Sequence, residues 1–205
     1  MKTIKILFEG DSLTANAFEK VDSSLGHGYA FKSVNHLKQE IPNINFECNN
    51  EAVFGCKTDD LLNRLEQELI KYKPDIFSLL IGVNDVRNGF DLEHFKENYH
   101  QIMELAKKHG CKIIIAEPYL CPVDIYHRYE SRPLLLQAQE VIKENASEYA
   151  DAFIPLDGLL YDAYLKNDPS SFFVDGLHWS DKGTDFFGEI HSKYLIRVVR
   201  ELTEK

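Results

Sequence analysis

Short apolar runs alternate with longer amphipathic stretches along the whole chain. Several of the short runs are nearly continuous in apolar and β-branched residues, as expected for strands covered on both faces of a sheet. Five strands are predicted, at Ile4–Phe8, Ile44–Cys48, Ile76–Ile81, Lys112–Ala116 and Ala152–Leu156. Elsewhere apolar residues recur at helical spacing, with charged residues between them. This pattern predicts helices at about Tyr29–Glu40, Thr58–Tyr72, Leu92–His109, Arg132–Tyr149 and Ser180–Leu202.

The regular order of strand and helix predicts a parallel sheet with right-handed crossovers and helices on both faces. No internal repeat, low-complexity tract or Gly/Ser-rich linker interrupts the order. We therefore expect a three-layer α/β/α fold with a five-stranded parallel sheet, as a single domain over residues 1–205. Open parallel sheets bind ligands at the carboxyl ends of their strands, so the loops that follow the strands are the places to look for chemistry.

The composition excludes several classes of protein. Of 205 residues, 44% are hydrophobic and 27% charged, which is ordinary for a soluble globular protein and unlike a disordered, collagen-like or coiled-coil chain. With 23 basic and 33 acidic residues the formal net charge is −10, and no run of lysine and arginine forms a basic patch. Such a chain repels nucleic acid and anionic membranes, so we expect a small-molecule partner and no nucleic-acid partner.

The cysteines and the start of the chain indicate the compartment. Cys48, Cys56, Cys111 and Cys121 are too irregularly spaced for a CxxC pair and too few for a disulfide scaffold, so we interpret them as reduced thiols. The first apolar run turns acidic at Glu9, which is too early for a signal peptide, and no later run is long enough to span a bilayer. The sequence predicts a cytoplasmic protein without a membrane span.

A serine and an Asp-x-x-His pair are the first candidates for chemistry. Ser12 follows the first strand in Glu9-Gly10-Asp11-Ser12-Leu13-Thr14, where its hydroxyl is suited either to nucleophilic attack or to capping a helix. Asp175-Gly176-Leu177-His178 places a carboxylate and an imidazole on one side of a turn, as a catalytic pair requires. A capping aspartate beside an unrelated histidine, or two metal ligands, would have the same spacing. We interpret the other histidines, His191 among them, as solvated.

Two further loops offer donors for a developing oxyanion. Gly55, after the second strand, has no Cβ and can present its backbone N–H closely, and Asn84, after the third strand, carries a side-chain amide. A tight turn at Gly55 and an Asx turn at Asn84 explain the same residues without catalysis. Either loop on its own is therefore compatible with an oxyanion donor or with an ordinary turn.

Together these segments resemble the SGNH hydrolases, also called GDSL esterases or lipases. The serine block is Gly10-Asp11-Ser12-Leu13, Gly55 matches the glycine block, Gly82-Val83-Asn84-Asp85 matches GxND, and Asp175-Gly176-Leu177-His178 matches DxxH, all in the order found in the family. The resemblance implies a flavodoxin-like sheet. It also implies Ser12 as nucleophile, His178 as base and Asp175 as its orienting carboxylate.

The same resemblance assigns the oxyanion hole to the backbone N–H groups of Ser12 and Gly55 and the side-chain amide of Asn84. Asp11 and Asp85 are expected to brace their loops. Thr14 stands where the G-x-S-x-G motif of α/β-hydrolases requires glycine, which separates the chain from that larger class. Departures from the SGNH pattern are Cys56 after the block glycine and Trp179 after the histidine, where proline is frequent. Neither changes a catalytic atom.

These roles predict hydrolysis of a carboxylic ester through an acyl-Ser12 intermediate. No cofactor or metal is expected, because no group of His, Cys and Asp has the spacing of metal ligands. Acetylated sugars or other short-chain esters are the leading substrates, and lysophospholipids, longer acyl esters or thioesters come second. A pocket is expected from Leu13, Phe54, Tyr119 and Trp179, with a core position as the alternative for Trp179. A non-catalytic flavodoxin-like binding module is the rival from another class, and homo-oligomer formation stays open.

Overall fold

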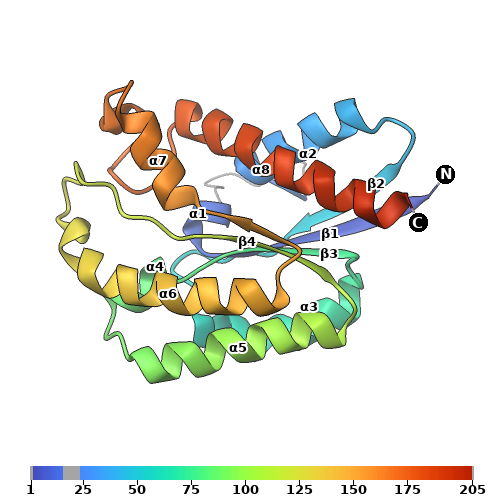
Figure 1. Cartoon of the computed structure of the whole chain (residues 1–205), viewed down its shortest axis with the longest axis horizontal. Helices are drawn as coiled ribbons and strands as arrows, with labels where there is room; N and C mark the ends of the chain where they lie inside the picture. Colours follow the sequence, from blue (N-terminus) through green and yellow to red (C-terminus); the bar gives the residue numbers. More distant parts are fainter. Residues whose placement is uncertain (1, 16–23, 205) are drawn as a thin grey trace.

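The computed structural model describes residues 2–15 and 24–204 and has a parallel sheet at its centre (Figure 1). Its five strands run in the order β2-β1-β3-β4-β5. They are β1 (Thr3–Gly10), β2 (Asn45–Asn50), β3 (Ile76–Leu80), β4 (Lys112–Ala116) and β5 (Ala152–Ile154). All neighbouring strands pair in parallel, which confirms the predicted three-layer α/β architecture.

Helices cover both faces of the sheet (Figure 1). One layer contains α2 (Tyr29–Glu40), α7 (Leu156–Tyr164) and α8 (Asp181–Thr203), and the other contains α3 (Thr58–Tyr72), α5 (Leu92–Lys108) and α6 (Arg132–Tyr149). Short helices stand in the loops: α1 (Ser12–Ala15), α4 (Val83–Arg87) and the 3₁₀ turns η1 (Arg128–Ser131) and η2 (Pro169–Phe172). Among the described residues, no helix combines the length and the apolar character of a transmembrane segment.

The long helices and the strands lie close to their predicted positions. The ranges of α2, α3 and α6 match the predictions, because each has an apolar face of three or more turns. The fifth strand ends at Ile154 and not at Leu156, since Pro155 interrupts it and α7 begins immediately afterwards. The helices α1, α4 and α7 were not predicted, and the first two are too short to show a helical period.

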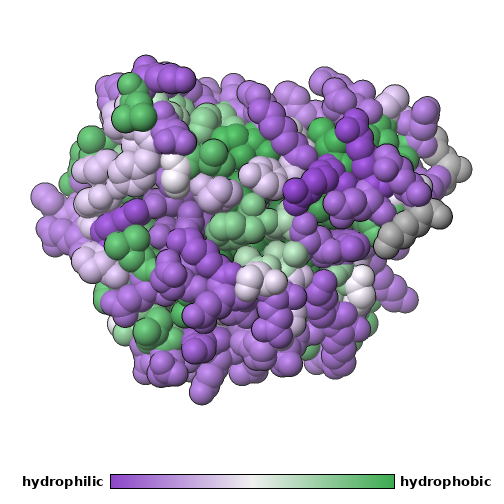
Figure 2. Space-filling view, viewed as in Figure 1, coloured by the Kyte–Doolittle hydropathy of each residue, from purple (hydrophilic) through white to green (hydrophobic). Residues whose placement is uncertain are grey.

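The buried core continues on both sides of the sheet, and every residue of β3 is buried. The outer surfaces of α5 and α6 are largely hydrophilic, with small apolar groups between the charged residues (Figure 2). His191 of α8 lies inside this core, where its Nδ1 and Nε2 are each 2.8 Å from the hydroxyls of Ser33 and Ser78. Complete burial lowers the pKa of His191 to about 3, so the ring is neutral. The interpretation of His191 as solvated is wrong, because it rested on neighbouring polar residues and ignored the face of α8.

Candidate active site

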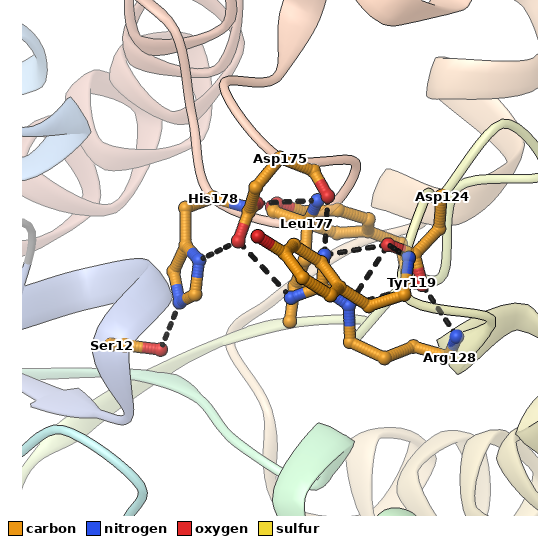
Figure 3. Close-up of polar contacts among 8 residues, drawn as sticks. Ser12, Tyr119, Asp124, Arg128, Asp175, Leu177 and His178 are labelled. Carbon is orange, nitrogen blue, oxygen red and sulfur yellow. Dashed lines mark hydrogen bonds and ion pairs between the residues drawn. The ribbon is translucent and has the colours of Figure 1, made fainter.

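Ser12, His178 and Asp175 form a continuous chain of hydrogen bonds (Figure 3). The Oγ atom of Ser12 lies 2.9 Å from Nε2 of His178, although the two residues are 166 positions apart. Nδ1 of the same ring lies 2.8 Å from Oδ2 of Asp175. A neutral imidazole protonated at Nδ1 satisfies both bonds, since it donates to the carboxylate and accepts from the hydroxyl. This arrangement prepares the serine oxygen for deprotonation.

A tight loop holds the aspartate and the histidine on one side. Phe173 and Trp179 form an antiparallel bridge, and the Val174 N–H donates to the carbonyl of His178 over 2.9 Å. Directly after the loop, Ser180 caps α8 by accepting a hydrogen bond from the Gly183 N–H. The loop is therefore fixed at both ends.

The Asp175 carboxylate is held in its ionised form. Its Oδ1 accepts from the backbone N–H groups of Leu177 and His178, at 3.0 and 2.8 Å. Although burial alone would raise the pKa of Asp175, these N–H groups, the His178 ring and the Arg128 guanidinium hold it well below its usual value. A permanent negative charge beside Nδ1 orients the ring and stabilises the imidazolium that would form when Ser12 is deprotonated.

Hydrogen bonds join the loops that carry the candidate oxyanion donors. The Val53 N–H donates to the carbonyl of Gly10 over 3.1 Å, which ties the loop after β2 to the serine block. Gly55 turns this loop with φ +74°, a conformation that favours glycine. The Nδ2 atom of Asn84 donates to the carbonyl of Cys56 over 3.3 Å. Since Nδ2 carries two hydrogens, this bond orients the amide and leaves a second N–H for a ligand.

Asp11 and Asp85 brace loops, as predicted. Oδ1 of Asp11 accepts from the Leu13 N–H over 2.9 Å, and Oδ1 of Asp85 accepts from the backbone and the hydroxyl of Thr58. Burial raises the pKa of Asp11 to about 7, partly offset by the Leu13 N–H and reinforced by the charge of Asp85. The pKa of Asp85 is raised as well, again mainly by burial.

Asp11→Asn should flatten the dependence of stability on pH. Between pH about 3.8 and 7 the unfolded chain releases the Asp11 proton while the folded chain keeps it. The stability contributed by Asp11 is thus complete at low pH and is lost as the pH rises to about 7, by roughly 1.4 kcal/mol per pH unit. Denaturant unfolding of both proteins at pH 5 and pH 8 measures this loss. Equal losses in wild type and variant would contradict the assignment.

The structure corrects part of the predicted substrate pocket. Leu13 and Tyr119 are fully buried, so the expectation that they line an accessible pocket is wrong. Leu13 belongs to α1, whose four residues are all buried, and the Tyr119 hydroxyl donates to the carbonyl of Leu177 over 2.6 Å. Trp179 is also buried, stacked on Phe173, which agrees with the core alternative. Phe54 is 45% exposed, and its place in the substrate pocket stays a prediction.

The predicted cysteine state is confirmed, and one polar pair was missed. All four cysteines lie within the described residues and are free thiols, and burial raises the pKa of Cys56 to about 11.

Arg128 and Asp124, which lie in the segment between β4 and α6, contact the loop of Asp175. In the sequence, their only signal is an Asp and an Arg four positions apart, which is common on any surface.

Comparison with known proteins places these motifs in context. The profile of the GDSL-like lipase/acylhydrolase family matches residues 8–186. An acetylxylan esterase from Geobacillus stearothermophilus is 26% identical over 192 residues, which cover 87% of this chain and 88% of that protein.

Solved structures share the fold. A GDSL-like protein from Parabacteroides merdae superposes with a TM-score of 0.84 at 21% identity, covering 94% of this chain and 95% of the other. The acetylxylan esterase from Geobacillus stearothermophilus superposes with a TM-score of 0.79 at 23% identity, covering 95% of this chain and 93% of the other.

Proposed function

The chain belongs to the GDSL-like lipase/acylhydrolase family and is a hydrolase of ester bonds, and from this premise we propose that Ser12, His178 and Asp175 are its catalytic triad. The hydrogen-bond chain from Ser12 Oγ through His178 to Asp175, at 2.9 and 2.8 Å, is the observation that carries the proposal. It joins a nucleophile, a base and an ionised orienting group from opposite ends of the sequence in the order that acyl transfer requires.

The reaction follows from this geometry. His178 Nε2 takes the Ser12 proton as Oγ attacks the ester carbonyl, and the resulting oxyanion accepts hydrogen bonds from the backbone N–H groups of Ser12 and Gly55 and from Asn84 Nδ2. The imidazolium then protonates the leaving oxygen as the ester C–O bond breaks, so the alcohol departs and an acyl-Ser12 ester remains. Water, deprotonated by His178, attacks this ester, and the released Ser12 regains the proton. Asp175 stays ionised throughout.

The relative from Geobacillus stearothermophilus supports the choice of residues. Three solved structures of that acetylxylan esterase are of catalytic mutants in which a serine, an aspartate or a histidine is replaced by alanine. The aspartate and the histidine replaced there are three positions apart, as are Asp175 and His178. The proposed triad has the same residue types.

For the substrate we propose an acetyl ester of a sugar. The relative of 26% identity over most of both chains acts on acetylxylan by its name, and the net charge of −10 disfavours anionic substrates. We propose that Phe54, which precedes Gly55 in the sequence and is 45% exposed, stacks on the uncharged sugar ring. The relatives do not favour the alternative, a longer-chain ester or a thioester.

Rates on two substrate series test this choice. We expect kcat/KM on p-nitrophenyl esters to be highest for acetate and to fall toward the C12 ester, with acetate released from acetylated xylooligosaccharides. A maximum at C8 to C12, or a thioester preferred over its matched oxygen ester, would contradict the proposed acetyl ester. Ser12→Ala serves as the background control for each substrate.

Asn84→Ala should lower kcat by about a hundred- to a thousand-fold with a much smaller change in KM, because the amide acts on charge that develops only in the transition state. Steady-state kinetics on p-nitrophenyl acetate measure the effect. Asn88→Ala is the matched control, since Asn88 closes the same helix and donates to the carbonyl of Asn84 over 3.0 Å. A loss of similar size in both variants would count against an oxyanion role for Asn84.

A further inference from the structure

Arg128 is a buried cation that contacts the loop of the proposed catalytic aspartate. It begins η1, in the segment between β4 and α6, and its side chain is only 7% exposed. The side chain of its partner Asp124 is 1% exposed. Figure 3 shows the guanidinium between Asp124 and Asp175, with His178 on the far side of the Asp175 carboxylate. A buried arginine needs several well-placed acceptors. The acceptors of Arg128 are Asp175 itself and Asp124, which packs against the same loop.

The guanidinium joins two segments through its fork of donors. Nε and Nη2 donate to the carboxylate of Asp124, at 3.0 and 2.6 Å. Nη1 donates to Oδ2 of Asp175 over 3.2 Å, and Nη2 also donates to the backbone carbonyl of Asp175. Oδ2 is the same oxygen that accepts from Nδ1 of His178. Arg128 therefore fixes both the side chain and the backbone of Asp175.

Two other contacts join the same segments. The segment between β4 and α6 supplies the Tyr119 hydroxyl, which donates to the carbonyl of Leu177. Gly176, with φ +85°, packs so closely on Asp124 that a Cβ there would lie 2.5 Å from the Asp124 Cα. Asp175, Gly176 and Leu177 belong to the loop closed by the Phe173–Trp179 bridge, which we call the catalytic loop, and all three contact this one segment.

We propose that Arg128 is a positioning residue for ester hydrolysis, which holds the Asp175 carboxylate against His178 and, through Asp124, anchors the catalytic loop to the segment after β4. The inference rests on the proposed triad, since Arg128 acts through Asp175 and not on the substrate. The Asp124 carboxylate and the Asp175 carboxylate and carbonyl lie in different directions around the planar guanidinium. A lysine ammonium has the same charge but cannot donate in all of these directions at once.

Arg128→Lys is the variant that tests the fork. Lysine keeps a positive charge beside the buried Asp124, but one ammonium group cannot reach the carboxylates of Asp124 and Asp175 and the carbonyl of Asp175 together. We expect kcat on p-nitrophenyl acetate to fall by about ten- to a hundred-fold with KM within about twofold, because misplacement of Asp175 and His178 acts on the chemical step. Thermal unfolding establishes that the variant is folded.

Arg132→Lys is the matched control. Arg132, four residues further on, is also largely buried and donates from Nη1 and Nη2 to Asp157, at 2.6 and 2.5 Å. Asp157 lies on α7, outside the catalytic loop. We expect kcat of this variant within about twofold of wild type.

If Arg128→Lys fails to fold, the double variant Arg128→Met with Asp124→Asn takes its place. It removes both charges of the Arg128–Asp124 pair together, and we expect the same loss of kcat.

Three results would overturn the proposal. The first is a wild-type kcat in folded Arg128→Lys, or in the double variant if that is used, because it would show that the arginine fork is not needed. The second is an equal loss of kcat in Arg132→Lys, because it would show a general effect of weakened ion pairs. The third comes from Ser12→Ala, measured in parallel, which distinguishes failure of the proposed triad from failure of the role of Arg128. If it keeps wild-type activity, the triad and the role of Arg128 fail together. If it is inactive while Arg128→Lys is unimpaired, the role of Arg128 alone fails.

Discussion

Ser12→Ala should lower kcat by about a million-fold, which is the order expected when the nucleophile of a triad that acts as a unit is removed. The loss is large because alanine has no oxygen to attack the ester, so the acyl intermediate cannot form and His178 has no bound nucleophile to activate. Ser12 is 8% exposed and its side chain is small, so the fold should tolerate alanine. Rates on p-nitrophenyl acetate, together with thermal unfolding of both proteins, measure activity and folding separately.

Ser33→Ala is the control for this prediction. It removes another serine–imidazole hydrogen bond of 2.8 Å, to His191 in the core, and leaves the proposed site intact. We expect Ser33→Ala to lower the free energy of unfolding and to leave kcat nearly unchanged. A Ser12→Ala variant that retains a tenth or more of wild-type kcat would contradict the proposed nucleophile.

Asp175→Asn should lower kcat by about ten thousand-fold, the order found when a triad carboxylate becomes an amide. An asparagine amide group facing Nδ1 favours the tautomer with the proton on Nε2, which cannot accept from Ser12. The variant also loses the negative charge that would stabilise the imidazolium. Steady-state kinetics from pH 6 to pH 9 measure the loss.

Asp157→Asn is the control for Asp175→Asn, because it weakens the ion pair with Arg132 at a distance from the catalytic loop. We expect it to change stability more than kcat. A kcat for Asp175→Asn within tenfold of wild type would mean that Asp175 is a structural cap for the loop and not part of the triad.

The sequence predicts the architecture well because its long elements carry strong local signals. The helices α3 and α6 are found at their predicted bounds because an apolar face repeats over four turns. The helices α1 and α4 are four and five residues long, so no period exists to be read. His191 was misjudged because its burial depends on which face of α8 packs on the sheet.

The candidate site could be predicted as a set of motifs but not as a geometry. Ser12 and His178 both lie in recognisable motifs, but parallel-sheet topology places only Ser12, which directly follows β1, at the carboxyl edge of the sheet. His178 follows α7 and η2 and is linked to Ser12 by the family resemblance alone. The 2.9 Å contact between them depends on how the loop of Asp175 is supported. That support comes from Arg128 and Asp124, whose roles exist only after two distant segments pack together. Leu13 shows the reverse error, because it stands beside the proposed nucleophile in the sequence but its side chain is fully buried.

Labelling with a fluorophosphonate tests the central claim most directly, because this electrophile forms a stable bond only with a serine activated by its own base. Wild type and Ser12→Ala are each incubated with the probe, and the intact masses and the labelled peptide are determined. We predict one adduct per wild-type chain, located on Ser12, and no adduct on Ser12→Ala. An unlabelled wild type, or equal labelling of the two proteins, would contradict the account.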